Sequence, residues 1–149
     1  MSGLPEPVGR FHFPLRVEQV DAETWRLTAL LVFVSARYQT TIVVPEGTET
    51  DFASVPRAPL AYWLFAGVGQ AAAVVHDWMY RVDTNVPRHV ADEIFLEAME
   101  ACGVSAWRRW PIYYAVRAFG GRRYRYRAAP AAGLEQHPAG ELEREPELE

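Results

Sequence analysis

A helix is predicted by the run Ala71-Ala-Ala-Val-Val-His76-Asp77-Trp-Met-Tyr80-Arg81. The apolar residues that mark its buried face are Ala72, Val75 and Met79. His76 and Tyr80 are four residues apart and share one face of this helix, whereas Asp77 points about a quarter-turn away. Ionisable side chains in apolar surroundings cost free energy unless they are hydrogen-bonded or bind a ligand. We therefore expect a polar site on this helix.

A second helix, expected over residues 88–101, supplies a carboxylate for that site. Asp92 flanks its apolar stripe, and the face that we expect to be exposed carries Glu93, Glu97 and Glu100. Asp92 can orient His76 through one ring nitrogen while the other takes a proton, and Tyr80 can donate a hydrogen bond to the same carboxylate. The sequence equally allows a buried hydrogen bond between His76 and Asp92 with a purely structural role.

A polar loop before the first helix reads Thr48-Glu-Thr-Asp51-Phe-Ala-Ser54-Val-Pro56-Arg57. Pro56 disfavours a helical conformation in the residues before it, so Asp51 can present its carboxylate from an extended or turn backbone. Hard cations such as calcium prefer oxygen ligands, and Asp51 together with Asp77 would supply them. A cation beside a water-activating His76 predicts ester hydrolysis. The alternative is that Asp51 and Ser54 only form an Asx turn or cap a helix.

The N-terminal third favours β-strands, because β-branched and aromatic residues are frequent there. The candidate strands are residues 13–20, 24–38 and 40–44. A third helix is expected from about Ser105, and Pro111 either kinks it or marks its start. The core-facing stripe expected on this helix consists of Tyr113, Val116 and Phe119. The pattern predicts an α+β fold in which a small antiparallel sheet packs with about three helices.

The chain has 149 residues, half of them hydrophobic, which suits one folded domain over residues 10–121. We expect a flexible N-terminus over 1–9, a basic-aromatic segment over 122–127 and a disordered acidic tail over 128–149. Cys102 is the single cysteine, which excludes an intramolecular disulfide and a zinc site built from cysteines. No secretory signal is recognisable, and no apolar run approaches about 18 residues, so we expect neither secretion nor a membrane span.

The basic-aromatic segment alternates arginine with tyrosine, and its arginines are Arg122, Arg123, Arg125 and Arg127. Such interleaving can contact phosphates in nucleic acid, anchor a partner protein or balance the charge of the acidic tail. Nucleic acid is the partner that we favour least.

Four motifs resemble, in order, those of a family of small phage and prophage proteins that is known only as a domain of unknown function. They are Thr50-Asp-Phe-Ala-Ser-Val-Pro-Arg57, Ala73-Val-Val-His-Asp-Trp-Met-Tyr-Arg81, Ala91-Asp-Glu-Ile-Phe-Leu96 and Tyr113-Tyr-Ala-Val-Arg-Ala-Phe-Gly120. The likeness extends over roughly residues 10–121. It implies a phage or prophage origin, a location in the bacterial host cytoplasm or the virion, and virion proteins as partners, but no activity.

The run His76-Asp77-Trp-Met-Tyr80-Arg81, followed by Ala91-Asp92-Glu-Ile-Phe95, is also similar to the core of prokaryotic phospholipase A2. The roles that this resemblance implies are a base at His76, its orienting carboxylate at Asp92, support for that carboxylate from Tyr80, and calcium ligands at Asp51 and Asp77. The substrate would be a lipid or other ester. The chain departs from that enzyme in having no disulfide and no glycine within 51–56. Two functions therefore stay open: a calcium-dependent hydrolase, or a non-enzymatic virion or assembly protein with a structural His-Asp-Tyr network.

Overall fold

The computed structural model describes residues 8–50, 69–82, 85–122 and 124 of the chain, and it has the predicted α+β fold. The strands are β1 (Arg10–Phe11), β2 (Val17–Gln19), β3 (Trp25–Leu27), β4 (Leu31–Ser35), β5 (Thr40–Val44) and β6 (Glu49–Thr50). The helices are α2 (Gln70–Arg81), α3 (Arg88–Ala101) and α4 (Ala106–Phe119), followed by the 3-10 turn η1 (Gly120–Arg122). Within these ranges, no helix combines the length and apolarity needed to cross a membrane.

The strands form two antiparallel sheets, where the sequence had suggested one. One sheet has the order β1-β4-β5 and the other β2-β3-β6. The apolar run 24–38 is divided between them, because β3 pairs with β2 and β6 while β4 pairs with β1 and β5. Neither glycine nor proline stands between β3 and β4, so local sequence gives no sign of the break.

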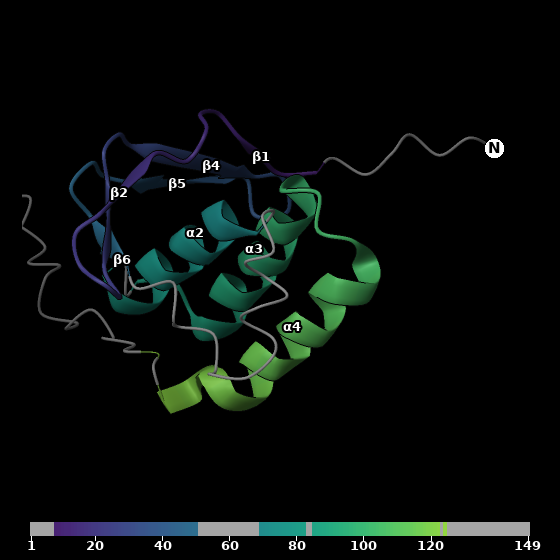
Figure 1. Ribbon diagram of the computed structural model, residues 1–149. Helices are drawn as coiled ribbons and strands as arrows, with labels where there is room; N and C mark the ends of the chain where they lie inside the picture. The colour runs from purple at the N-terminus through teal and green to yellow at the C-terminus, as the bar shows by residue number, and fades with distance from the viewer. Residues whose placement is uncertain (1–7, 51–68, 83–84, 123, 125–149) are drawn as a thin grey trace, which may run out of the picture.

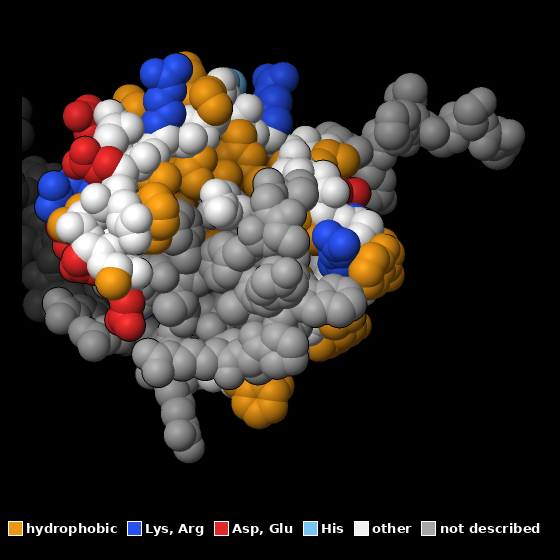
Figure 2. Space-filling model, in the orientation of Figure 1, with side chains coloured by type: hydrophobic (Ala, Val, Ile, Leu, Met, Phe, Trp, Pro, Cys, Tyr) orange, Lys and Arg blue, Asp and Glu red, His pale blue; other side chains and the backbone are white. Residues whose placement is uncertain are grey.

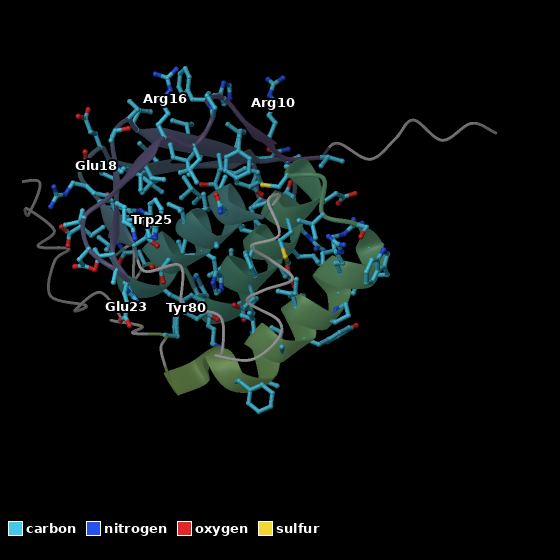
Figure 3. All side chains as sticks on the ribbon, viewed as in Figure 1. Arg10, Arg16, Glu18, Glu23, Trp25 and Tyr80 are labelled. Atoms are coloured by element: carbon cyan, nitrogen blue, oxygen red, sulfur yellow. The ribbon has the colours of Figure 1, made fainter. Side chains whose placement is uncertain are left out.

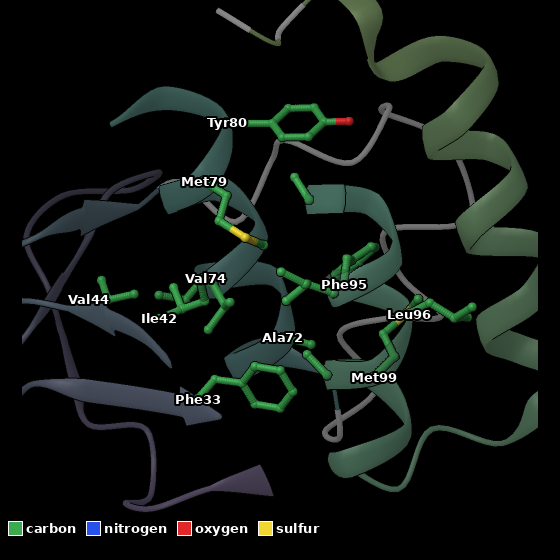
Figure 4. Close-up of a cluster of buried hydrophobic side chains, with 14 of the residues drawn as sticks. Phe33, Ile42, Val44, Ala72, Val74, Met79, Tyr80, Phe95, Leu96 and Met99 are labelled. Atoms are coloured by element: carbon green, nitrogen blue, oxygen red, sulfur yellow. The ribbon is translucent and has the colours of Figure 1, made fainter. Parts of the chain in front are cut away.

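Figure 1 shows three layers: the sheet of β1, β4 and β5, then α2 with α3, then α4 on the far side of α3. Alternation along β4 turns Leu31 and Phe33 towards the helices. Figure 4 shows side chains from the sheet meeting those of α2 and α3 in one core, with Phe33, Ile42, Val44, Val74, Met79, Phe95 and Met99 among them. The alanines and valines of α2 allow this close approach, and most of that helix is buried.

The third helix begins at Ala106, so Pro111 lies inside α4 instead of marking its start. A proline there removes the N–H that would bond to the carbonyl of Trp107. The stripe expected to face the core is only partly buried: Val116 is buried, Tyr113 is half-buried, and Phe119 is exposed because it lies at the end of the helix.

The expectation that Glu97 is exposed was wrong. Glu97 is buried where α3 passes the turn between β4 and β5. Its carboxylate accepts hydrogen bonds from the Ser35 hydroxyl at 2.6 Å and from the backbone N–H groups of Ala36 and Arg37 at 2.7 and 3.2 Å. The carboxylate thereby satisfies the donors of a turn that would otherwise be unpaired beneath the helix.

Candidate functional site

Three of the predicted site residues, His76 and Tyr80 of α2 and Asp92 of α3, meet inside the molecule. His76 Nε2 lies 3.0 Å from Asp92 Oδ1, and the Tyr80 hydroxyl donates a hydrogen bond to the same oxygen. The side chains of His76, Tyr80 and Asp92 are almost fully buried, with 2%, 2% and 0% exposure. Figure 4 shows Tyr80 directed away from the sheet side of the core, and Figure 3 places it towards the end of α2.

The Asp92 carboxylate determines which nitrogen of His76 carries the proton. Burial acts to raise the pKa of Asp92, but hydrogen bonds from His76, Tyr80 and Arg117 outweigh burial and hold that pKa below its ordinary value. Asp92 is therefore ionised at neutral pH and can only accept hydrogen bonds. Nε2 of the neutral imidazole must then carry the hydrogen, which leaves the lone pair on Nδ1. The arrangement makes Nδ1 the basic nitrogen of His76.

Tyr80 and neighbouring rings fix the position of the imidazole. Burial, and then the hydrogen bond to Asp92, raise the pKa of Tyr80, so its hydroxyl stays protonated and donates. The ring of His76 lies 4.0 Å from that of Tyr80 and stacks on Phe95 at 4.4 Å. The ring of Tyr124 meets Tyr80 edge-on at 5.2 Å.

Two arginines that the sequence reasoning missed complete this network. Arg117 Nη1 of α4 donates to Asp92 Oδ2 at 2.8 Å, and Arg88 Nε lies 3.8 Å from the same oxygen. Arg88 Nη2 also donates to the carbonyls of Val116 and Arg117, at 3.1 and 2.6 Å. The ion pair with Asp92 raises the pKa of Arg117. The available signal was an arginine within the motif Tyr113-Tyr-Ala-Val-Arg-Ala-Phe-Gly120, beside the core residue Val116.

Asp77 does not join this network and instead faces β6. Its Oδ2 accepts a hydrogen bond from the Thr50 hydroxyl at 3.3 Å, and its Oδ1 lies 3.4 Å from Nε of Arg81. The side chain is buried and borders a small hollow between β6 and α2. Asp51, its predicted calcium partner, directly follows β6 in the sequence but lies outside the described residues, as does Ser54.

The described ranges contain no group of three or more His, Cys, Asp or Glu side chains that could hold a metal ion. They supply one of the two predicted calcium ligands, Asp77, and pair it with an arginine. Of the basic-aromatic segment, Arg123, Arg125 and Arg127 lie outside the described residues, and only the backbone of Arg122 is described, within η1.

Comparison with known proteins adds a family but no activity. No curated protein and no solved structure matches the chain. Residues 25–116 match the family described as "Protein of unknown function (DUF1353)". That match includes His76, Tyr80, Asp77 and Asp92 and covers more than half of the sequence. The chain therefore belongs to the DUF1353 family.

Proposed function

We propose that the chain is a phage- or prophage-encoded ester hydrolase of phospholipase A2 type, acting on a lipid or other ester of the host envelope. The observation that carries the proposal is the bond from His76 Nε2 to Asp92, which leaves Nδ1 as a base. A water molecule at Nδ1 would give up a proton to the imidazole while its oxygen attacks the ester carbonyl. The imidazolium would then return the proton to the departing alkoxide.

The surrounding residues have positioning roles in this proposal. Asp92 holds the tautomer and stabilises the imidazolium, while Tyr80 and Arg117 hold the Asp92 carboxylate in place. His76 is only 2% exposed, so substrate reaches Nδ1 only when residues around the site move aside. Such opening steps are common in enzymes that exclude water from the reacting atoms.

The assay that tests the proposal measures hydrolysis of phospholipid and of a soluble ester by the full chain. We expect His76→Ala to lower the rate by about 100-fold or more, because a positioned general base contributes on that scale. Since a buried alanine could also destabilise the fold, His76→Gln is the second variant. Its side-chain amide can still donate a hydrogen bond to Asp92 but cannot act as a base.

The proposal requires His76→Gln to keep the fold and lose the activity. A wild-type chain without activity towards either ester, or a folded His76→Gln variant with full activity, would refute it. Thermal unfolding followed by circular dichroism reports the fold separately from the rate.

Calcium is part of the proposed mechanism, with Asp77 and Asp51 as its ligands. When bound, it would polarise the ester carbonyl. Nε of Arg81 lies 3.4 Å from Oδ1 of Asp77. Because the Arg81 side chain is 41% exposed, it can turn towards solvent and leave that oxygen to calcium. We expect calcium to raise the wild-type rate, and Asp77→Asn to weaken the apparent calcium affinity by about tenfold or more, because it removes a charged ligand.

A matched control for the calcium prediction is Glu49→Gln. Glu49 borders the same hollow but is paired with Arg26 at 2.8 Å. Calcium titrations of the hydrolysis rate should therefore coincide for wild type and this control. If Asp77→Asn also responds to calcium as wild type does, Asp77 is not a ligand.

A second candidate function is supported by the charge balance of the network. Arg117 and Arg88 both approach Asp92, so the ionised carboxylate has cationic partners from α3 and α4 without any ligand. A phage virion or assembly protein could use this network only to hold its helices together. In that case the chain shows no hydrolysis, and His76→Gln affects the free energy of unfolding alone. Co-purification of the chain with phage particles would favour this candidate.

A further inference from the structure

The chain returns to the end of α2 after α4 ends. The turn η1 begins at Gly120, which is buried, and Tyr124 of the basic-aromatic segment is half-buried a few residues later. We call η1 together with Tyr124 the C-terminal clamp. It lies beyond the family match, which ends at residue 116. Its contacts with the network of His76, Tyr80 and Asp92 therefore come from outside the matched domain.

The first residue of the clamp lies directly against the Tyr80 hydroxyl. A Cβ atom placed on Gly120 would be 3.0 Å from that oxygen, so the hydroxyl would have to move by a few tenths of an ångström. Gly120 has φ −72° and ψ −12°, a helical conformation that any residue adopts. The close fit to Tyr80, and not the backbone, is therefore what requires a glycine here. Figure 4 shows Tyr80 projecting from the end of α2 towards the side where α4 lies.

Tyr124 is attached at three points. Its backbone N–H donates to the carbonyl of Gly120 at 3.3 Å. Its hydroxyl donates to the carbonyl of Val86, just before α3. Its ring meets Tyr80 edge-on, which is a favourable arrangement for two aromatic rings. The first two contacts fix the ring of Tyr124, and the third transmits its position to Tyr80.

The position of Tyr80 matters to His76 because both side chains use the same oxygen. The Tyr80 hydroxyl and His76 Nε2 converge on Asp92 Oδ1. A displaced Tyr80 would alter the polarisation of that oxygen and admit water as a competing donor. The hydrogen bond that determines the tautomer of His76 would then be weaker. Order in the network therefore depends on what holds Tyr80.

We propose that the C-terminal clamp positions Tyr80, and through it Asp92 and His76, so that the candidate site extends beyond the DUF1353 match. Tyr124 is in this view a positioning residue, because its ring acts only through Tyr80. The order of the network does not depend on any reaction. Its consequence for the rate of hydrolysis rests on the proposed function.

The test follows the imidazole of His76 by NMR of the nitrogen-labelled full chain. In wild type we expect hydrogen on Nε2 and slow exchange of that hydrogen with solvent, because the side chain is buried. Tyr124→Leu keeps an apolar side chain but removes the ring and the hydroxyl. We expect the Nε2 hydrogen of this variant to exchange about tenfold or more faster, because the network opens locally more often. Tyr124→Phe keeps the ring, so its exchange rate should lie between those of wild type and Tyr124→Leu.

Gly120→Ala is a second variant that leaves the side chain of Tyr124 unchanged. Its methyl group presses on the Tyr80 hydroxyl, so it should also speed the exchange of the Nε2 hydrogen. The matched control is Tyr114→Leu, on the outer side of α4. Figure 2 shows hydrophobic side chains at the surface along the edge that α4 forms. Tyr114 is 62% exposed, and its ring contacts Trp110 and Tyr113. The control should exchange as wild type does.

Hydrolysis measured on the same variants separates the clamp from the proposed function. Tyr124→Leu should lower kcat by about tenfold with KM unchanged, because a shifted base slows the chemical step. A wild type without hydrolysis refutes the proposed function, and the exchange rates still test the clamp. The clamp proposal is overturned if Nε2 carries no hydrogen in wild type, or if Tyr124→Leu exchanges as Tyr114→Leu does. If Tyr124→Leu does not fold, wild-type exchange in Gly120→Ala overturns the proposal.

Discussion

Replacing Asp92 by asparagine is expected to lower the free energy of unfolding by about 3–5 kcal/mol, the range observed when one member of a buried ion pair is removed. Asp92 is fully buried, and donors approach both of its carboxylate oxygens. His76 and Tyr80 approach Oδ1, and Arg117 approaches Oδ2. Without the negative charge, the partly exposed guanidinium groups of Arg117 and Arg88 lose the buried carboxylate that balances their charge.

No orientation of an asparagine amide satisfies all these donors. If its NH₂ group faces Arg117, two donors meet. If the NH₂ group faces His76 instead, the imidazole must accept through Nε2 and move its proton to Nδ1. That tautomer has no lone pair at the nitrogen that the proposed mechanism uses as a base. Any hydrolytic activity should therefore fall even in the fraction of Asp92→Asn molecules that remains folded.

Urea unfolding measured over a range of pH values tests this prediction. The pKa of Asp92 is lowered in the folded state, so the carboxylate contributes stability above its unfolded pKa of about 3.9 and loses that contribution as the pH falls towards the folded value. The difference in free energy of unfolding between wild type and Asp92→Asn should therefore become smaller below about pH 4. Glu100→Gln is the control on α3, where a half-exposed carboxylate pairs with Arg109 and the change should be within about 0.5 kcal/mol. If Asp92→Asn and Glu100→Gln have equal free energies of unfolding at pH 7, the prediction is contradicted.

The arrangement of His76, Tyr80 and Asp92 could be predicted because helical periodicity determines it. A four-residue spacing puts His76 and Tyr80 on one face of α2, and the apolar positions of α3 place Asp92 next to the core. Two helices that bury apolar stripes against each other must then bring these side chains together. The same periodicity predicted where α2 and α3 lie in the sequence. The frequency of β-branched residues predicted that the N-terminal third consists of strands.

Residues whose partners lie far along the chain escaped prediction. Glu97 looked like part of an exposed acidic face because the turn that it caps belongs to a different element. Arg117 is 25 positions from Asp92, and no local pattern connects them. The aromatic residues of α4 fitted a core stripe by spacing, but α4 is the outer layer of the molecule and only its inner face is covered. In each case tertiary packing, which periodicity does not contain, determined the outcome.

Glu97→Ala is expected to lower the free energy of unfolding by about 3–4 kcal/mol, because hydrogen bonds to a charged group are each worth about 1.5–3 kcal/mol and part of that value returns as solvation. The substitution removes the acceptor of three donors, which are the buried Ser35 hydroxyl and the backbone N–H groups of Ala36 and Arg37. These groups form the turn between β4 and β5. The loss should therefore loosen the sheet edge as well as the whole fold.

Glu97→Gln should recover about half of that loss. Its amide oxygen can still accept from the two backbone N–H groups, and its NH₂ can donate to Ser35 Oγ, which already accepts from the N–H of Tyr38. The backbone amides of Ala36 and Arg37 should exchange hydrogen most slowly in wild type, faster in Glu97→Gln and fastest in Glu97→Ala. Glu100→Ala is the control on the exposed face of the same helix. If Glu97→Ala matches this control in denaturant midpoint and exchange rate, the buried carboxylate does not stabilise the turn.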